Sequence, residues 1–287
     1  MPLPNFLIVG TPKAGTTAIY NYLNQHPQIY LPSFKEPHFF SFEGESKPHW
    51  GINTLEEYSQ LFEGVSHEKA IGEASTWYLY SQTAAQRIKH HIPDVKLIAI
   101  LRNPVDRAYS SWGFRVQSSW EPITDFKKAI EAQRTKNRSG WDFDYLNVGF
   151  YYIQLKRYFD LFSRDQIRVY LYEDFKKDAM AVIQDIFAFI NVEDSFKPNI
   201  SVQHNVTKMT TNQWLNKFLS RQSGVKSLVK ELVPSVIKEQ LSTQVRTANQ
   251  FKLPPLSSVV RQEILEMYKD DISNLEKLLE RDLSTWL

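Results

Sequence analysis

The stretch IVGTPKAGTT at residues 8–17 has the composition of a phosphate-binding loop, but its lysine stands in an unusual place. A Walker A loop reads G-x-x-x-x-G-K-[ST], and its lysine follows the second glycine so that it reaches the β- and γ-phosphates. Gly10 and Gly15 keep that glycine spacing, whereas Thr16 occupies the lysine position and Lys13 lies inside the loop. A strand, a tight turn and a helix that begins near Thr16 would still aim several backbone N–H groups at an anion. The pattern therefore predicts a site for a single phosphate; the alternative is an ordinary glycine turn.

A second candidate anion site is the segment LIAILRNPVDRAYSSW at residues 97–112. Arg102 leaves the carboxyl end of an apolar strand, and Ser110 follows on the next helix. Ligands of open α/β sheets bind beyond the carboxyl ends of the strands, so this segment and the first loop can face one ligand. Arg102 suits a bidentate phosphate contact, with Ser110 as a hydroxyl donor. Arg107 is an alternative clamp, and a structural salt bridge is the alternative role for Arg102.

The elements that must position these residues alternate along the chain. Short apolar runs predict buried parallel strands at 6–9, 69–72, 96–101 and 167–172. Helical periodicity predicts helices at 16–25, 83–91, 104–120, 125–135, 150–162, 176–190 and 257–286. This alternation is typical of an α/β fold with a mostly parallel sheet that helices cover on both faces.

The 287-residue chain has 34 Lys and Arg against 32 Asp and Glu, and it has no cysteine. The formal net charge of +2 gives no reason to expect a nucleic-acid or membrane partner. Absence of cysteine fits a reducing compartment, so we expect a cytoplasmic protein. We find no signal peptide and no run near the roughly 18 apolar residues of a membrane span. We expect one domain over 1–287, in which 200–256 forms an irregular helical lid, and leave the oligomeric state open.

At this point several motifs together resemble one family. TPKAGTT at 11–17 and LRNPVDRAYSS at 101–111 are similar to the two phosphate motifs of sulfotransferases that use 3′-phosphoadenosine 5′-phosphosulfate. The pattern is nearest to the heparan sulfate sulfotransferase branch and its bacterial relatives. KEPHFF at 35–40, VYLYEDF at 169–175 and LEKLLERDLSTW at 275–286 also resemble that group. The resemblance implies a three-layer, P-loop-like fold with a helical carboxy-terminal region.

The resemblance also implies roles for single residues. Lys13 would hold the bridging oxygen of the leaving phosphate, Arg102 and Ser110 would bind the 3′-phosphate, and Lys208 would close over it. No metal is implied. The loop that would cradle the 5′-phosphate consists of Thr11, Pro12, Lys13, Ala14, Gly15, Thr16 and Thr17.

An acceptor hydroxyl must lose its proton as it attacks, so a general base should stand near the sulfur. Glu36 and His38 in KEPHFF are the candidates, and relatives use the glutamate of this motif. We expect Glu36 to be the base, with His38 as its partner or replacement. Lys35 between the loop and this glutamate is interpreted as a solvated side chain.

Glu73 in GEAST follows a third strand and is a candidate for binding the acceptor. The heparan sulfate branch typically has a lysine after this glutamate, where this chain has Ala74. The missing cation argues against a glycosaminoglycan acceptor. Trp77, Tyr170 and Tyr172 are candidates for a wall against the adenine.

We therefore expect a sulfotransferase that acts on a hydroxyl group of a small molecule, lipid, sugar or carrier-tethered chain. A small-molecule kinase would need the Walker lysine and a strand-end carboxylate for magnesium, and the strand LIAIL ends in Arg102 instead. A third hypothesis is a degenerate protein that binds the sulfonucleotide without catalysis. The joint presence of Lys13, Glu36, His38 and Arg102 argues against it.

Overall fold

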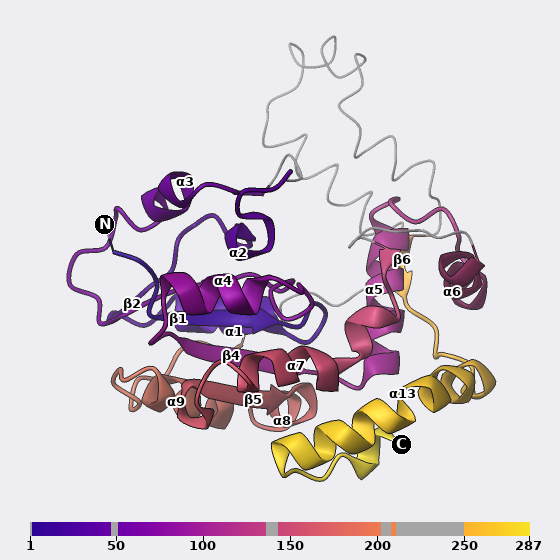
Figure 1. Ribbon diagram of the computed structural model, residues 1–287. Coiled ribbons are helices and arrows are strands. Elements are labelled where there is room, and N and C mark those ends of the chain that lie inside the picture. Colours follow the sequence, from indigo (N-terminus) through magenta and orange to yellow (C-terminus); the bar gives the residue numbers. More distant parts are fainter. Residues whose placement is uncertain (1, 47–50, 136–142, 202–207, 211–249) are drawn as a thin grey trace, which may run out of the picture. The chain divides into compact units, whose positions relative to one another are not determined.

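The computed structural model describes residues 2–46, 51–135, 143–201, 208–210 and 250–287 (Figure 1). The chain forms two compact units, and each is described by itself. The first comprises Met1–Arg107, Val148–Asn205 and Leu265–Leu287, and the second comprises Ala108–Asn147 and Val206–Ile264. The expectation of a single domain over 1–287 stays a prediction.

The first unit is built on a five-stranded parallel sheet with the order β2-β3-β1-β4-β5. The four long strands are the four predicted from apolar runs, so the α/β prediction is confirmed. Sequence reasoning missed β2, which has two residues and no apolar run of its own. The strand bounds are β1 (Phe6–Gly10), β2 (Ile29–Tyr30), β3 (Ala70–Ala74), β4 (Lys96–Leu101) and β5 (Ile167–Leu171).

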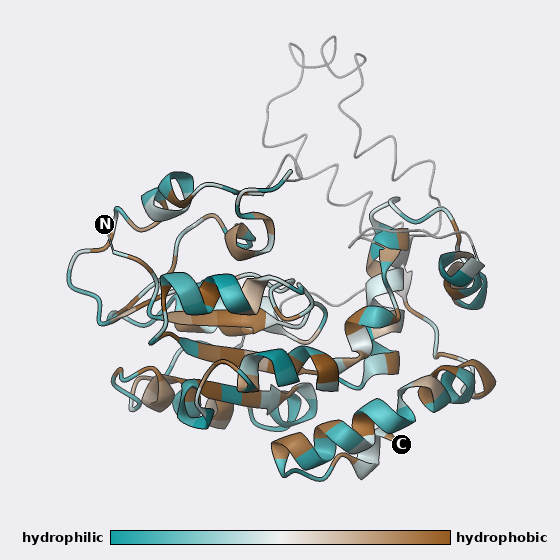
Figure 2. Ribbon diagram, viewed as in Figure 1, coloured by the Kyte–Doolittle hydropathy of each residue, from teal (hydrophilic) through white to brown (hydrophobic). Residues whose placement is uncertain are grey.

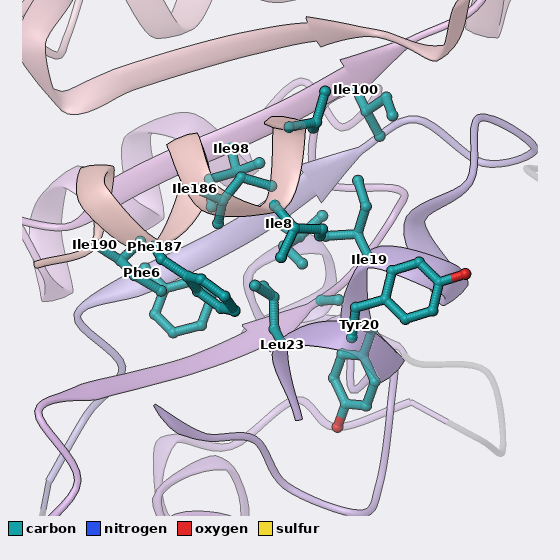
Figure 3. Close-up of a cluster of buried hydrophobic side chains, with 14 of the residues drawn as sticks. Phe6, Ile8, Ile19, Tyr20, Leu23, Ile98, Ile100, Ile186, Phe187 and Ile190 are labelled. Atoms are coloured by element: carbon teal, nitrogen blue, oxygen red, sulfur yellow. The ribbon is translucent and has the colours of Figure 1, made fainter. Parts of the chain in front are cut away.

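Helices cover both faces of this sheet (Figure 1). On one face, α1 (Thr16–Leu23), α8 (Tyr172–Lys177) and α9 (Ala179–Phe189) pack on strand residues such as Ile8 and Ile98 (Figure 3). Strand side chains alternate, so Leu7 and Val9 of β1 point to the other face, where they are also buried. The first unit also contains α4 (Ala84–His91) and α7 (Tyr151–Phe159). In Figure 2 the strands are mostly apolar, whereas the helices carry both polar and apolar residues.

The structure differs from two of the helical predictions, and it contains two short helices that were not predicted. The helix expected over 176–190 is two helices, because Asp178 ends α8 and its side chain accepts a hydrogen bond from the Ala181 amide to cap α9. The short helices α2 (Phe39–Phe42) and α3 (Leu55–Gln60) were not predicted. The carboxy-terminal helix α13 (Ser258–Leu279) ends earlier than expected and is followed by a 3₁₀ turn at Ser284–Trp286. Within the described ranges, no helix is long and apolar enough to cross a bilayer.

The second unit contains most of α5 (Pro104–Gln117), α6 (Phe126–Thr135) and the first turns of α13. The strands β6 (Lys208–Thr210) and β7 (Gln250–Lys252) pair antiparallel within it. Most of the lid predicted for 200–256 lies outside the described residues. Glu121 is fully buried here, and its carboxylate accepts hydrogen bonds from the Tyr145 hydroxyl at 2.9 Å and the Ile123 amide at 2.8 Å.

Asn103 connects the start of α5 to the carboxyl terminus within the first unit. Its Oδ1 accepts hydrogen bonds from the amides of Val105 at 3.0 Å and Asp106 at 3.2 Å, which caps the helix. Its Nδ2 donates to the Trp286 carbonyl at 3.1 Å, and the side chain is buried. One amide side chain therefore holds the segment that carries Arg102 and anchors the end of the chain.

We predict that Asn103→Ala lowers the free energy of unfolding by about 1–2 kcal/mol, because both the helix cap and a buried hydrogen bond are lost. Asn103→Ser keeps a capping oxygen, introduces no charge and loses the donor to Trp286, so its effect should be smaller. Urea unfolding followed by circular dichroism measures both. Equal losses in the two variants would mean that the cap contributes nothing.

Candidate functional site

The predicted site residues of the first unit lie where the parallel strands β1, β3 and β4 end, which we call the carboxyl edge. Backbone hydrogen bonds join the segments that follow these strands. The Thr11 amide donates to the Ile100 carbonyl at 2.9 Å, and the Ser75 amide donates to the Ile8 carbonyl at 3.1 Å. The chain after each of the three strands is therefore held beside its neighbours, as ligand sites of open α/β sheets require.

The loop at 11–17 leaves β1 and enters α1 with its amide groups available. Gly15 has φ +96°, and its carbonyl accepts hydrogen bonds from the amides of Ala18 and Ile19. Among the described residues, the amide groups of residues 14–17 have no hydrogen-bond partner. Unpartnered amides at the start of a helix form an anion site with the positive end of the helix dipole. Lys13 and Thr17 are partly exposed on this loop, whereas Thr16 is buried.

Arg102 is held against this loop from the end of β4. Its Nη1 donates to the Lys13 carbonyl at 3.1 Å, and its guanidinium lies 4.8 Å from the centre of the Tyr172 ring. A Cβ on Gly15 would meet the same ring at 3.3 Å. Tyr172 thus packs against both the loop and the arginine, and its place as a wall against the adenine stays a prediction. Arg102 is partly exposed and Arg107 is buried, which favours Arg102 as the phosphate ligand.

Glu36 and His38 lie on a turn that is bonded to the end of β3. The Glu36 amide donates to the Ala74 carbonyl at 3.0 Å. The Glu36 carboxylate forms an ion pair with Lys35, lies 3.4 Å from His38 Nε2 and accepts a hydrogen bond from the Thr76 hydroxyl at 3.4 Å. The Lys35 side chain is only 20% exposed and is ion-paired with Glu36, so its interpretation as a solvated side chain was wrong. Its ammonium also lies 5.9 Å from the centre of the Tyr20 ring.

The surroundings of Glu36 keep its carboxylate ionised. Burial raises its pKa, but the hydrogen bond with His38 and the ammonium of Lys35 outweigh that effect and lower the pKa from 4.5 to about 2. The Glu36 side chain is 34% exposed, whereas His38 is only 2% exposed. Of the two candidate bases, Glu36 is the one that a molecule at the surface can reach.

Glu73 occupies a different environment from the one expected for a residue that binds an acceptor. Its side chain is fully buried and accepts hydrogen bonds from Ser75 at 2.9 Å and Tyr58 at 3.3 Å. A carboxyl group with no exposed surface cannot touch an acceptor without rearrangement. The adjacent Ala74 points to the opposite face of β3 and is fully buried in the hydrophobic cluster that contains Ile8 and Ile98, so it faces the core.

Two predicted site residues belong to the second unit. Ser110 lies on α5 and is 9% exposed. Lys208 begins β6, and its side chain lies outside the described part of the structure. The structure thus brings together Lys13 with Arg102 and Glu36 with His38, while the assignment of Ser110 and Lys208 to a 3′-phosphate stays a prediction. Sequence reasoning did not predict that Lys35 and Thr76 contact Glu36 or that Tyr172 packs against Arg102. These contacts depend on burial and on segments that lie far apart in the sequence.

We predict that Lys35→Gln raises the pKa of Glu36 from about 2 toward its ordinary value of 4.5. The lowered pKa contributes stability that is present above pH 4.5 and is lost as the pH falls through about 2. Loss of the ammonium moves the lower limit of that window upward. Carboxyl ¹³C NMR titration measures the pKa directly. Lys127→Gln, which breaks an exposed pair with Glu263 in the second unit, is the control and should leave Glu36 unchanged; an unmoved pKa in Lys35→Gln would contradict the assigned cause.

Comparison with known proteins supplies the family. The profile of the Sulfotransferase domain matches residues 3–250. The crystal structure of a sulfotransferase from Alicyclobacillus acidocaldarius superposes with a TM-score of 0.76 at 31% identity, covering 100% of this chain and 99% of that one. A membrane-associated sulfotransferase, kil1, of Dictyostelium discoideum is 37% identical over 115 residues, which is 40% of this chain and 24% of the relative.

A bifunctional heparan sulfate N-deacetylase/N-sulfotransferase 4 of Mus musculus is 28% identical over 300 aligned residues. That alignment covers 99% of this chain and 31% of the mouse protein. The chain therefore spans less than a third of either of these two curated relatives. The domain match and the full-length likeness to a bacterial enzyme show that this chain belongs to the sulfotransferase family.

Proposed function

We propose that the chain transfers a sulfuryl group from 3′-phosphoadenosine 5′-phosphosulfate to an acceptor hydroxyl, without a metal. The observation that carries this proposal is the contact of Arg102 with the Lys13 carbonyl beside the amides of residues 14–17, which have no hydrogen-bond partner among the described residues. That contact brings two anion-binding groups together at the edge of the sheet where Glu36 also lies. Membership of the sulfotransferase family supports the type of reaction.

The loop at 11–17 is the proposed site of the 5′-phosphate. The amides of residues 14–17, which have no partner among the described residues, can donate hydrogen bonds to phosphate oxygens. The Lys13 ammonium can stabilise the negative charge that develops on the leaving oxygen. Arg102 is the proposed ligand of the 3′-phosphate, because its guanidinium is fixed by Tyr172 and the Lys13 carbonyl. The roles of Ser110 and Lys208 at the 3′-phosphate stay predictions from the sequence.

Glu36 is the proposed general base. As the acceptor oxygen bonds to sulfur, the bond between sulfur and the bridging oxygen breaks, and the acceptor proton moves to the Glu36 carboxylate. A carboxylate with a pKa of about 2 is a weak base. It suffices because a hydroxyl that is already bonding to sulfur becomes strongly acidic, so the proton leaves late. His38, at 3.4 Å, supports the carboxylate from its buried side.

We propose a hydroxyl of a small molecule, lipid, sugar or carrier-tethered chain as the acceptor. The mouse relative is named an N-sulfotransferase, so an amine acceptor is the alternative that the experiment must distinguish.

We also propose a cytoplasmic location, with which the absence of cysteine is compatible. A degenerate protein that binds the sulfonucleotide without turnover is the second candidate function, and it predicts binding without transfer.

We predict that Lys13→Ala and Arg102→Ala weaken the binding of adenosine 3′,5′-bisphosphate by about 10- to 100-fold, because each removes a charge-assisted contact. Titration calorimetry measures this binding, with magnesium ATP as the competing ligand class. Arg164→Ala, an exposed arginine paired with Glu280, is the control and should bind as the parent chain does. Preference for magnesium ATP over the bisphosphate would refute the proposal.

Glu36→Gln should bind the bisphosphate with unchanged affinity and lower kcat by about 10²- to 10⁴-fold, the usual contribution of a general base. Mass spectrometry of hydroxyl and amine acceptors measures the added sulfuryl group. Binding by the parent chain with no transfer to any acceptor would favour the degenerate protein. An equal loss of binding in Glu36→Gln and Arg102→Ala would refute the division of roles.

A further inference from the structure

The turn that carries the proposed base has a backbone conformation that needs support. Glu36 has φ +63° and His38 has φ +54°, in the left-handed region that side chains other than glycine rarely adopt. Such conformations persist only where the surrounding structure holds them. The contacts that hold residues 36 and 38 therefore decide where the Glu36 carboxylate points.

Two of these contacts come from the end of β3. The Glu36 amide donates to the Ala74 carbonyl at 3.0 Å, and the His38 amide donates to the Ser75 hydroxyl oxygen at 3.0 Å. The first bond is backbone to backbone, so no side chain is needed for it. The second depends on a hydroxyl group that can either donate or accept.

Glu73 determines how that hydroxyl is used. Ser75 Oγ donates its only proton to Glu73 Oε2 at 2.9 Å, which leaves its lone pairs for the His38 amide. Glu73 is in turn held by the Tyr58 hydroxyl at 3.3 Å and by the hydroxyl of Tyr78. A chain of hydrogen bonds thus runs from a fully buried carboxyl group to the backbone of the turn.

We propose that Glu73 is a positioning residue for the sulfuryl-transfer base, acting through Ser75 on the backbone of His38 and so on Glu36. This inference rests on the proposed function, in which Glu36 takes the acceptor proton. Glu73 does not touch the substrate. It orients the Ser75 hydroxyl as an acceptor and thereby keeps the turn in its left-handed conformation.

The protonation of Glu73 supplies a way to observe this role. Burial raises its pKa from 4.5 to about 7, although the hydroxyls of Tyr78, Ser75 and Tyr58 partly counteract that rise. An ionised carboxylate can only accept, so Ser75 must donate to it and both Ser75 lone pairs remain for the His38 amide. A protonated carboxyl can donate to Ser75 instead, which occupies one of the two lone pairs and makes the Ser75 oxygen a weaker acceptor for that amide. The turn should therefore be held best above pH 7. The titratable groups that face Glu73 from the surrounding elements are Tyr20, Lys35, Tyr58, Tyr78 and Tyr158.

The pH dependence of folding stability distinguishes a positioning role of Glu73 from a purely stabilising one. The folded chain keeps the Glu73 proton to a higher pH than the unfolded chain does. Its contribution to stability is therefore present below pH 4.5 and is lost as the pH rises through about 7. Ionisation of Glu73 therefore lowers the free energy of unfolding as the pH rises through about 7, whereas over the same pH range it should strengthen the hydrogen bond that holds the turn.

The experiment compares Ser75→Ala and Glu73→Gln with two matched controls. Ser41→Ala removes another buried hydroxyl, on α2, whose Oγ has no hydrogen-bond partner among the described residues. Glu121→Gln neutralises another fully buried glutamate that accepts a tyrosine hydroxyl, in the second unit. Three properties are measured: kcat against pH, binding of adenosine 3′,5′-bisphosphate, and hydrogen exchange of the His38 amide by NMR.

Ser75→Ala is expected to lower kcat about tenfold and to speed exchange of the His38 amide by a similar factor, because one hydrogen bond is lost. Its affinity for the bisphosphate should stay within about twofold, since the donor loop is untouched. Glu73→Gln keeps an oxygen for Ser75 but cannot ionise. It should lack the rise of kcat through pH 7 that the parent chain shows, while both controls keep the parent profile.

Parent values of kcat and His38 exchange in Ser75→Ala would overturn the proposal, as would an unchanged pH step in Glu73→Gln. Absence of transfer by the parent chain would overturn the proposed function instead. In that event the His38 exchange rate still tests the positioning role, because it does not depend on turnover.

Discussion

Parallel pairing of β1 with β3 and β4 is the constraint on which the rest of the site depends. The registers align Phe6 with Gly72 and with Lys96, so the three strands end at the same edge of the sheet. The segments with Lys13 and Arg102 follow β1 and β4, and the end of β3 binds the turn that carries Glu36. Because the strands are buried on both faces, a slip in register would bring every strand side chain against the wrong neighbours in a closely packed interior, so core packing also fixes where the three strands end.

The environments of two carboxyl groups near this edge shift their pKa values in opposite directions. Glu36 stands between a lysine and a histidine at the surface, and its pKa falls to about 2. Glu73 lies among hydroxyl groups in the interior, and its pKa rises to about 7. Divergent pKa values of neighbouring acids commonly mark a division of roles. Here the partly exposed acid is the proposed base, and the buried one is proposed to hold the backbone of the turn.

The accuracy of the sequence predictions follows the length of each pattern. β4 is apolar after Lys96, and β5 is apolar except for Arg168, so the existence and approximate bounds of both strands could be predicted directly. β2 has two residues and exists because Ile29 and Tyr30 pair with β3. Helix α2 has four residues and follows the left-handed His38, a conformation that no propensity predicts. Short elements of this kind depend on distant partners, so local reasoning missed them.

The sequence by itself determined the strand pattern, the loop with Lys13 inside it, and the strand-end position of Arg102, because each is a relation within one short segment. Only the tertiary structure decided that Tyr172 packs against Arg102, that Lys35 pairs with Glu36, and that Glu73 is buried. The physical reason is that burial and side-chain contact depend on which strands lie side by side. The local sequence around a glutamate at the end of a buried strand does not show whether its side chain faces a ligand or is buried among hydroxyl groups, as Glu73 is.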